Sequence, residues 1–287
     1  MQAVHVGLFV EEMRQGASQA AALRIAEEVA TVDHISEGRF EFGIGRSGVV
    51  RTYDIYGVPY AESQARFREA LEIIRQGWTG EPFSYEGEFY RVQNAVVTPR
   101  PYQRPHPPIR MATTSDETFP AAGRMGLPIF VGLRTTEIPD LQQQLAPYRQ
   151  AWRDAGHPGP PSVYLRIPVY VSTTDKGAAE EPRESLTSFF QRQTELARAA
   201  VGRAGAGPAD RRRFQAERMA SLSYEDILER KVAFGTAAGV IERLQRLRDE
   251  LGLDGIVAEL NPGGRIPPEL ETRSLELLAR EVLPAFR

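Results

Sequence analysis

A single arginine stands between glycines in the stretch GRFEFGIGRSG, residues 38–48. Its last three glycines have the G-x-G-x-x-G spacing of a dinucleotide-binding turn, which requires a helix that opens at the third glycine. Residues 49–59 show no helical period and end at a proline, which argues against such a turn. We expect instead a strand that delivers Arg46 into a loop beside Gly45. Glycine lets the backbone approach a ligand, and arginine offers a rigid fork of donors suited to phosphate.

A second candidate is the hydroxyl-rich turn TTSDET, residues 113–118, before a predicted helix. One interpretation is a capping box with Thr114 as N-cap and Glu117 three residues later, in which the hydroxyls only begin a helix. The other is a phosphate site, because backbone amides, the helix dipole and side-chain hydroxyls converge at a helix start. The residues alone favour the capping box. Asp116 and Glu117 also oppose a bound phosphate unless their carboxylates point away.

Several separated motifs, taken in order, resemble the bacterial-luciferase-like flavin monooxygenases. The resemblance implies an α/β fold, a (β/α) TIM-barrel-like domain that binds reduced FMN or, in one branch, a reduced deazaflavin. Such enzymes activate O2 at the mouth formed by the carboxyl ends of the strands. The motifs are VGLF (6–9, like the first strand of the family), LRIAEE (23–28), GRFEFGIGR (38–46), WTGEP (78–82), PRP (99–101) and RPHPPI (104–109).

The resemblance also assigns roles in cofactor binding. It implies that Arg46, with Gly45, holds the flavin phosphate together with the turn that follows the family's fifth strand. A Ser-x-x-Thr pattern in that turn corresponds to Ser115 and Thr118, with Thr114 beside them. With the resemblance, the phosphate site becomes the preferred interpretation of the turn, although both interpretations can hold together.

The ends of the first and last predicted strands supply the remaining candidates. Phe9 and Glu12 lie where the first strand would reach the mouth, and Glu259 and Asn261 emerge at the same end of the last strand. We therefore expect all four at the flavin and substrate mouth. No residue is predicted to be catalytic, because the cofactor carries the difficult chemistry. The four histidines are scattered and there is no cysteine, so no metal site is predicted.

The number of predicted strands is smaller than a closed barrel of this family requires. About six βα units can be recognised instead of eight, and only some ten residues separate the first strand from the LRIAEE helix, where the family has two further units. An incomplete barrel would expose unpaired backbone groups along a parallel strand, so we expect a homo-oligomer that covers this edge. The predicted strands are residues 4–10, 39–45, 109–113, 127–132, 163–171 and 253–260.

Composition excludes several other classes of protein. The 287 residues fit one barrel domain, with 41% hydrophobic and 25% charged residues, as in ordinary globular proteins. A net charge of −3 gives no support for nucleic-acid binding. No apolar run approaches the roughly 20 residues of a membrane span, and no signal-peptide pattern begins the chain. The lack of cysteine fits a reducing compartment, so we expect a cytoplasmic protein.

These observations predict one domain over residues 1–287, and the resemblance implies an insertion at 172–232 that folds over the flavin as a lid. Without the resemblance, a peripheral pair of helices is an equally good interpretation of this region. The expected activity is a monooxygenase that uses reduced FMN and O2 to oxidise a small organic substrate, with a separate flavin reductase as partner. Two alternatives stay open. One is a flavin-binding protein without catalysis, since the units that complete the barrel are missing. The other is a deazaflavin-dependent oxidoreductase of the same superfamily.

Overall fold

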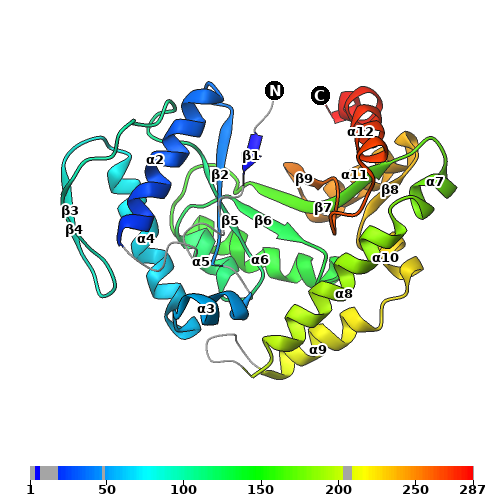
Figure 1. Ribbon diagram of the computed structural model, residues 1–287, viewed down its shortest axis with the longest axis horizontal. Helices are drawn as coiled ribbons and strands as arrows, with labels where there is room; N and C mark the ends of the chain where they lie inside the picture. Colours follow the sequence, from blue (N-terminus) through cyan, green and yellow to red (C-terminus); the bar gives the residue numbers. More distant parts are fainter. Residues whose placement is uncertain (1–3, 7–18, 47–48, 203–208, 287) are drawn as a thin grey trace. The chain divides into compact units, whose positions relative to one another are not determined.

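The computed structural model describes residues 4–6, 19–46, 49–202 and 209–286. It has an α/β fold with a parallel half-barrel sheet, which confirms the predicted fold class (Figure 1). The chain divides into two compact units. The first unit is Met1–Ala112 with Ala199–Ala209, and the second is Thr113–Arg198 with Asp210–Arg287.

The sheet of the first unit contains three parallel strands. These are β1 (Val4–Val6), β2 (Phe40–Ile44) and β5 (Ile109–Ala112), with β2 in the middle. The first, third and fifth residues of β2 are buried, as the alternation of apolar residues in its sequence predicts. Because β2 is held on both sides, the residues directly after it start from a fixed position.

Two helices pack against each other in this unit. Helix α2 (Gln19–Ile35) contacts α4 (Ser63–Gly77), and the two lie side by side in Figure 1. The indole of Trp78, directly after α4, donates a hydrogen bond of 3.0 Å to the carbonyl of Ala26. Helix α2 ends near Gly38, whose φ of 75° lies in the left-handed region that glycine tolerates.

A short antiparallel hairpin, β3 (Phe83–Glu86) and β4 (Arg91–Ala95), follows α4. Its turn is fixed by Glu69 of α4, whose carboxylate accepts the backbone N–H groups of residues 88, 89 and 90 at 2.9, 3.1 and 3.1 Å. The hairpin therefore docks on α4.

The residues after the glycine-rich stretch are helical, so the expectation of no helix there was wrong. Helix α3 (Val50–Tyr56) has seven residues, too few to show a clear period, and Gly57 ends it in the left-handed conformation. The dinucleotide-binding turn is still not supported. The next parallel strand, β5, begins only at Ile109, whereas that motif lies within a βαβ unit of about 30 residues.

The sheet of the second unit is organised around one long strand. Strand β7 (Val163–Val171) pairs in parallel with β6 (Ile129–Gly132), β9 (Gly255–Glu259) and β8 (Ala233–Gly235). Its first half pairs with β9 and its last three residues with β8. Strand β8 was not among the six predicted strands, because three residues are too few to establish an alternating pattern. The described residues thus contain seven parallel strands.

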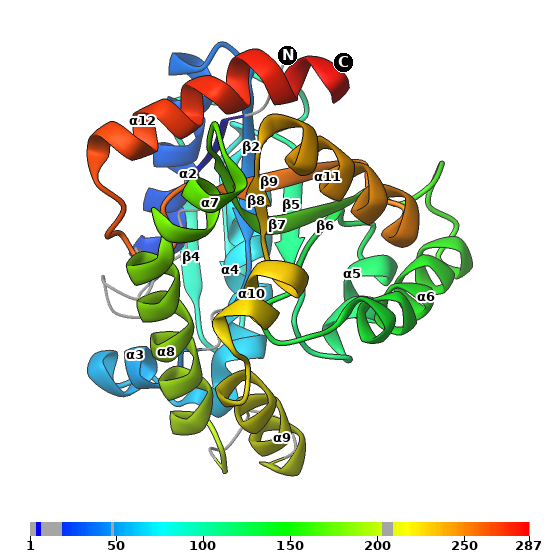
Figure 2. The same ribbon diagram turned by 90° about the vertical axis from the view of Figure 1, so that its right-hand side faces the viewer.

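Helices of the second unit lie beside this sheet (Figure 2). Helices α5 (Thr118–Arg124) and α6 (Ile138–Asp154) pack closely, because a Cβ at Gly123 would lie 2.5 Å from the carbonyl of Tyr148. Helix α11 (Ala237–Leu251) packs on β7 and β8, and α12 (Pro268–Leu277) packs on β7.

The predicted insertion contains four described helices rather than two. These are α7 (Asp175–Glu180), α8 (Arg183–Ala199), α9 (Ala209–Ala220) and α10 (Tyr224–Arg230). Pro182 separates α7 from α8, because proline lacks the N–H that a continuing helix needs. Ser223 starts α10 with a capping box that it shares with Asp226. Helices α8, α9 and α10, with the residue Val232 that follows them, share a core of Leu186, Phe190, Met219, Ile227 and Val232.

Candidate functional site

Arg46 lies two residues beyond β2, and three side chains of its own unit fix its position. Its Nη1 donates a 3.0 Å hydrogen bond to the Ser63 hydroxyl, and its guanidinium lies 4.9 Å from the centre of the Tyr60 ring. The Tyr53 hydroxyl donates to the Arg46 carbonyl. Gly45, between β2 and Arg46, is partly buried. The arginine is therefore held in a defined orientation at the carboxyl end of a central strand.

The residues that hold Arg46 come from α3, from the 3-10 turn that follows it and from the start of α4. The rings of Tyr53 and Tyr60 pack edge to face with centroids 4.8 Å apart, and both rings are buried together with Val50 and Ala200. Ser63 is the first residue of α4, directly after the short 3-10 turn Tyr60–Glu62. None of these supporting residues was a sequence candidate, because only the folded backbone brings them to Arg46.

The guanidinium fits the phosphate role predicted for Arg46. An arginine carries a permanent charge and five N–H donors in a fixed fork, which matches phosphate oxygens. A cation over an aromatic ring and against a hydroxyl has already lost much of its side-chain freedom, so less entropy remains to be lost on binding. The contacts of Arg46 with Tyr60 and Ser63 therefore suit an anion-binding residue.

The turn before α5 brings Ser115 and Thr118 together, with their hydroxyl oxygens 2.6 Å apart. The Thr118 hydroxyl also donates to the Ser115 carbonyl at 2.7 Å, and the Ser115 hydroxyl donates to the Glu117 carboxylate at 2.9 Å. The N-cap of α5 is Glu117, without a side-chain cap, and Thr114 is exposed before it. The capping box of Thr114 with Glu117 is therefore wrong, since the helix begins four residues after Thr114.

The two parts of the predicted phosphate site belong to different units. Arg46 and Gly45 lie in the first unit, while Thr114, Ser115 and Thr118 lie in the second. The structure thus brings together Ser115 and Thr118. Their partnership with Arg46 around one phosphate stays a prediction.

The mouth residues predicted at the strand ends have different surroundings. Glu259, the last residue of β9, forms an ion pair with Arg166 of β7. Asn261 holds its own loop, because its amide donates to the Ile266 carbonyl at 3.2 Å and to Glu271 at 2.8 Å. Asn261 therefore has a structural role in these contacts. The other two candidates, Phe9 and Glu12, lie outside the described residues.

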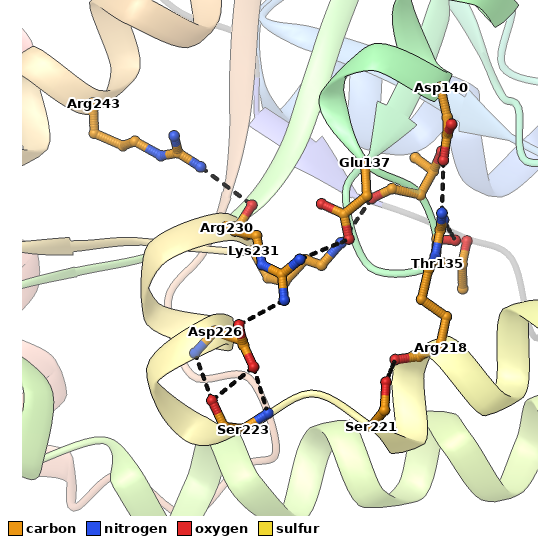
Figure 3. Close-up of polar contacts among 11 residues, drawn as sticks. Thr135, Glu137, Asp140, Arg218, Ser221, Ser223, Asp226, Arg230, Lys231 and Arg243 are labelled. Atoms are coloured by element: carbon orange, nitrogen blue, oxygen red, sulfur yellow. Dashed lines mark hydrogen bonds and ion pairs between the residues drawn. The ribbon is translucent and has the colours of Figure 1, made fainter.

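A polar cluster anchors the carboxyl-terminal half of the insertion to the segment after β6 (Figure 3). Lys231, with 2% of its side chain exposed, donates to the Thr136 carbonyl at 2.9 Å and to the Glu137 carboxylate at 2.6 Å. Arg218 of α9 donates to Asp140 at 2.7 Å and to the Thr135 carbonyl at 2.8 Å. The cluster fixes this half of the insertion to the start of α6.

Burial and hydrogen bonding lower the pKa values of two residues in this cluster. Burial lowers the pKa of Lys231, against the opposing effect of Glu137. The hydrogen bond from Arg218 lowers the pKa of Asp140. Because Lys231 is bonded to a carboxylate and a carbonyl, its contacts are those of a structural ion pair rather than of a nucleophile.

Among the described residues, no group of histidine, aspartate and glutamate is arranged to hold a metal ion. In the same residues, no helix is both long and apolar enough to cross a membrane.

Known proteins resemble this chain in sequence and in structure. It is 26% identical to the FMNH2-dependent dimethylsulfone monooxygenase of Pseudomonas putida over 274 residues, 91% of this chain and 70% of that protein. Its structure matches the oxygenating constituent of 3,6-diketocamphane monooxygenase from Pseudomonas putida, solved with FMN, with a TM-score of 0.71 and 21% identity. That match covers 92% of this chain and 75% of the other.

A third neighbour uses a different cofactor. The coenzyme F420-dependent tetrahydromethanopterin reductase of Methanopyrus kandleri matches with a TM-score of 0.67 and 21% identity, over 93% of this chain and 80% of that chain. The sequence model of the family described as "Luciferase-like monooxygenase" matches residues 18–255, most of the chain and both units. The glycine-flanked arginine and the hydroxyl turn lie inside this match, and the chain belongs to the luciferase-like monooxygenase family.

Proposed function

We propose that this protein is the oxygenase component of a flavin-dependent monooxygenase, which uses reduced FMN and O2 to oxidise a small organic substrate. The observation that carries the proposal is the fixed orientation of Arg46 over Tyr60 and against Ser63, at the end of a central strand. Membership of the family supports it, as does the FMNH2 dependence stated for the dimethylsulfone monooxygenase.

In this proposal the phosphate of FMN binds Arg46 and the hydroxyls of Ser115 and Thr118. Arg46 supplies charge and paired donors, and the hydroxyls supply donors from the turn before α5. The Ser115 hydroxyl donates to Glu117 in the structure, so phosphate binding requires this bond to be exchanged for one to the ligand. Glu117 is exposed, and its carboxylate can turn toward solvent when the phosphate binds.

The bound reduced flavin would supply the chemistry with O2, while the chain binds and orients the cofactor and excludes water. The insertion at 172–232 is proposed to cover the flavin, and its second half is already fixed through Lys231 and Arg218. A separate flavin reductase would supply reduced FMN, by analogy with the 3,6-diketocamphane monooxygenase, whose solved chain is described as its oxygenating constituent. We further propose a homo-oligomer, in which a second copy covers the edge of the incomplete barrel.

The match to a coenzyme F420-dependent reductase supports a deazaflavin as a second candidate cofactor. The structural match to an F420-dependent reductase is nearly as good as the match to the FMN enzyme, with TM-scores of 0.67 and 0.71. A deazaflavin-dependent oxidoreductase would hold its cofactor in the same fold but would transfer hydride without consuming O2. A third possibility, a flavin-binding protein without activity, is distinguished by the same measurements.

One series of titrations tests the proposal. The protein is titrated with FMN, reduced FMN and the deazaflavin under anaerobic conditions, and O2 uptake is then followed with reduced FMN and candidate substrates. We expect the tightest binding for reduced FMN and O2 uptake that exceeds autoxidation of the free flavin. Preference for the deazaflavin, without O2 uptake, would overturn the proposal in favour of the second candidate. FMN binding without any acceleration of O2 uptake would favour the flavin-binding protein.

A further inference from the structure

The second unit carries charged side chains on one face of its sheet, where a hydrophobic layer would be ordinary. Alternation along β6 and β7 buries Ile129, Val131, Leu165 and Ile167 on one face. The opposite face of β7 presents Arg166, with 49% of its side chain exposed, paired in register with Gly132 of β6 and Val257 of β9. A charged residue in the middle of a central strand is unusual.

A second arginine lies close to the first. Arg134 follows the end of β6 by two residues, and the charges that act on it are those of Arg166 and Glu259. Burial, together with the like charge of Arg166, lowers the pKa of Arg134. Two guanidinium groups and one carboxylate leave a net positive charge in this cluster. Such a pair of cations is stabilised by an anion placed between them.

Side chains of the insertion orient Arg134. Its Nη1 donates to Gln193 of α8 at 3.3 Å, and its guanidinium lies 5.9 Å from the centre of the Phe189 ring. The arginine is thus held by a neutral amide and a ring, neither of which neutralises its charge. If the only role of Arg134 were to stabilise the fold, we would expect a carboxylate to pair directly with its guanidinium.

Glu259 gives an independent observation. One of its oxygens accepts from Arg166, and the other, Oε2, is buried with no hydrogen-bond partner among the described residues. Burying an unsatisfied carboxylate oxygen is costly, whereas a partly exposed ion pair stabilises a fold only slightly. Fold stability therefore does not explain this arrangement, but a ligand that donates to Oε2 would.

Aromatic rings continue the same face below the arginines. Phe130 and Tyr164 pair across β6 and β7, with ring centroids 6.5 Å apart. The Tyr164 ring lies directly over Gly255 of β9, since a Cβ there would be 2.9 Å from the ring. The absence of a side chain at Gly255 lets the ring lie across the strand. The face thus combines an aromatic floor with a positive end.

We propose that Arg134, Arg166 and Glu259 form a substrate-binding site for a small organic anion, whose apolar or aromatic body lies on Phe130 and Tyr164. The guanidinium groups bind the carboxylate or sulfonate of the ligand, and Oε2 of Glu259 accepts from a donor group on it. The assignment of this ligand as the substrate rests on the proposed monooxygenase function, whereas the binding of the anion does not.

The test compares benzenesulfonate with its neutral analogue benzenesulfonamide, by isothermal titration calorimetry on the full chain at constant ionic strength. We expect the anion to bind at least tenfold more tightly than the amide. Arg166→Met and Arg134→Met should each reduce this preference about tenfold. Glu259→Gln should instead tighten benzenesulfonate binding, because it removes the competing negative charge from Arg166, and misfolding cannot produce such a gain.

Arg248→Met is the matched control, since Arg248 is 50% exposed and also pairs with a carboxylate, that of Asp249. It should leave the preference unchanged. Equal binding of the two compounds to the wild type, or an equal effect of Arg248→Met, would overturn the inference. FMN titration of the same variants separates the two proposals. Anion preference without FMN binding would refute the proposed function alone, and FMN binding without anion preference would refute this site alone.

Discussion

The guanidinium of Arg46 lies over the ring of Tyr60, 4.9 Å from its centre, while its Nη1 donates to Ser63 three residues further along. One short segment at the start of α4 thus holds the arginine through both a ring face and a hydroxyl. This arrangement makes the phosphate role of Arg46 open to direct tests.

Replacement of Arg46 by alanine should weaken FMN binding by about 1.5–3 kcal/mol, the range for a hydrogen bond to a charged group. Riboflavin lacks the phosphate, so its affinity should hardly change. Fluorescence titration with both ligands measures the difference. Arg51→Ala, at an exposed position of α3, is the control and should leave both affinities as they are. Equal losses for FMN and riboflavin would refute the phosphate role.

Tyr60 offers a finer test, because two substitutions separate its ring from its hydroxyl. Tyr60→Phe keeps the ring under the guanidinium and should retain FMN affinity. Tyr60→Leu removes the cation–π contact and should weaken FMN binding by about 0.5–1 kcal/mol. The same titration reports both values. If the two variants bind FMN equally well, the ring does not position Arg46.

Glu117 should oppose phosphate binding, since its carboxylate holds the Ser115 hydroxyl at 2.9 Å. Glu117→Gln should tighten FMN binding by about 1 kcal/mol, the interaction of two unit charges 4 Å apart in water. The gain should shrink as salt is added. Asp116→Asn is the control, because Asp116 accepts from Gln144 of α6 at 2.9 Å and should matter less. A gain that is independent of salt would contradict this explanation.

The insertion at 172–232 should respond to flavin if it is a lid. Limited proteolysis of the free protein should cut this region first, and saturating FMN should slow these cuts several-fold. Mass spectrometry of the fragments locates each cut. Riboflavin, which lacks the phosphate, should protect less. A cleavage pattern that ignores flavin altogether would make the insertion a peripheral helical layer.

The pair of Asp140 and Arg218 should make stability depend on pH in acid. The hydrogen bond from Arg218 lowers the pKa of Asp140 below its ordinary value of 3.8. Below that value the unfolded chain binds a proton that the folded chain does not. The contribution of the Asp140–Arg218 pair to the free energy of unfolding is therefore complete above about pH 4. It is lost as the pH falls through the lowered pKa of Asp140.

Asp140→Asn should remove this part of the acid sensitivity, so its free energy of unfolding should fall less steeply than that of the wild type as the pH falls below 4. Urea unfolding between pH 2.5 and 7 measures the difference. Arg218→Met removes the donor and should flatten the same part of the profile. Parallel profiles for wild type and variants would show that the pair has no such role.

The strongly periodic elements could be predicted from the sequence. Helix α2 and strand β7 lie almost where the apolar pattern puts them. Helix α2 buries one side in the core, and β7 buries nearly all of its length there. Strand β8 and helix α3 were missed, since three and seven residues form through tertiary contacts rather than through a pattern of their own. Pro182 and Ser223 divide the insertion into shorter helices, because a proline interrupts one helix and a capping serine begins another. These helix boundaries were missed because the polar sequence around them continues to look helical.

Prediction of the candidate site was less complete, for a physical reason. Arg46 could be recognised, because a charged residue between glycines is a local pattern. The contacts of Tyr60 and Arg134 could not, because each depends on side chains from other elements. Asn261 was placed at the mouth by its position after a strand, yet its amide holds a loop. Position along the chain indicates which end of the sheet a residue reaches but not which partner it meets.

Ala200 of the insertion is buried against the same tyrosines, Tyr53 and Tyr60, that hold Arg46. We therefore expect a ligand that changes the contact of Arg46 with Tyr60 to change the packing of Ala200 as well. Thermodynamic linkage makes this effect reciprocal. If ligand binding stabilises the packing of Ala200, that packing strengthens ligand binding by the same free energy. If the insertion is the proposed lid, its closure and the affinity for a phosphate-bearing cofactor would be two measures of one cooperative equilibrium.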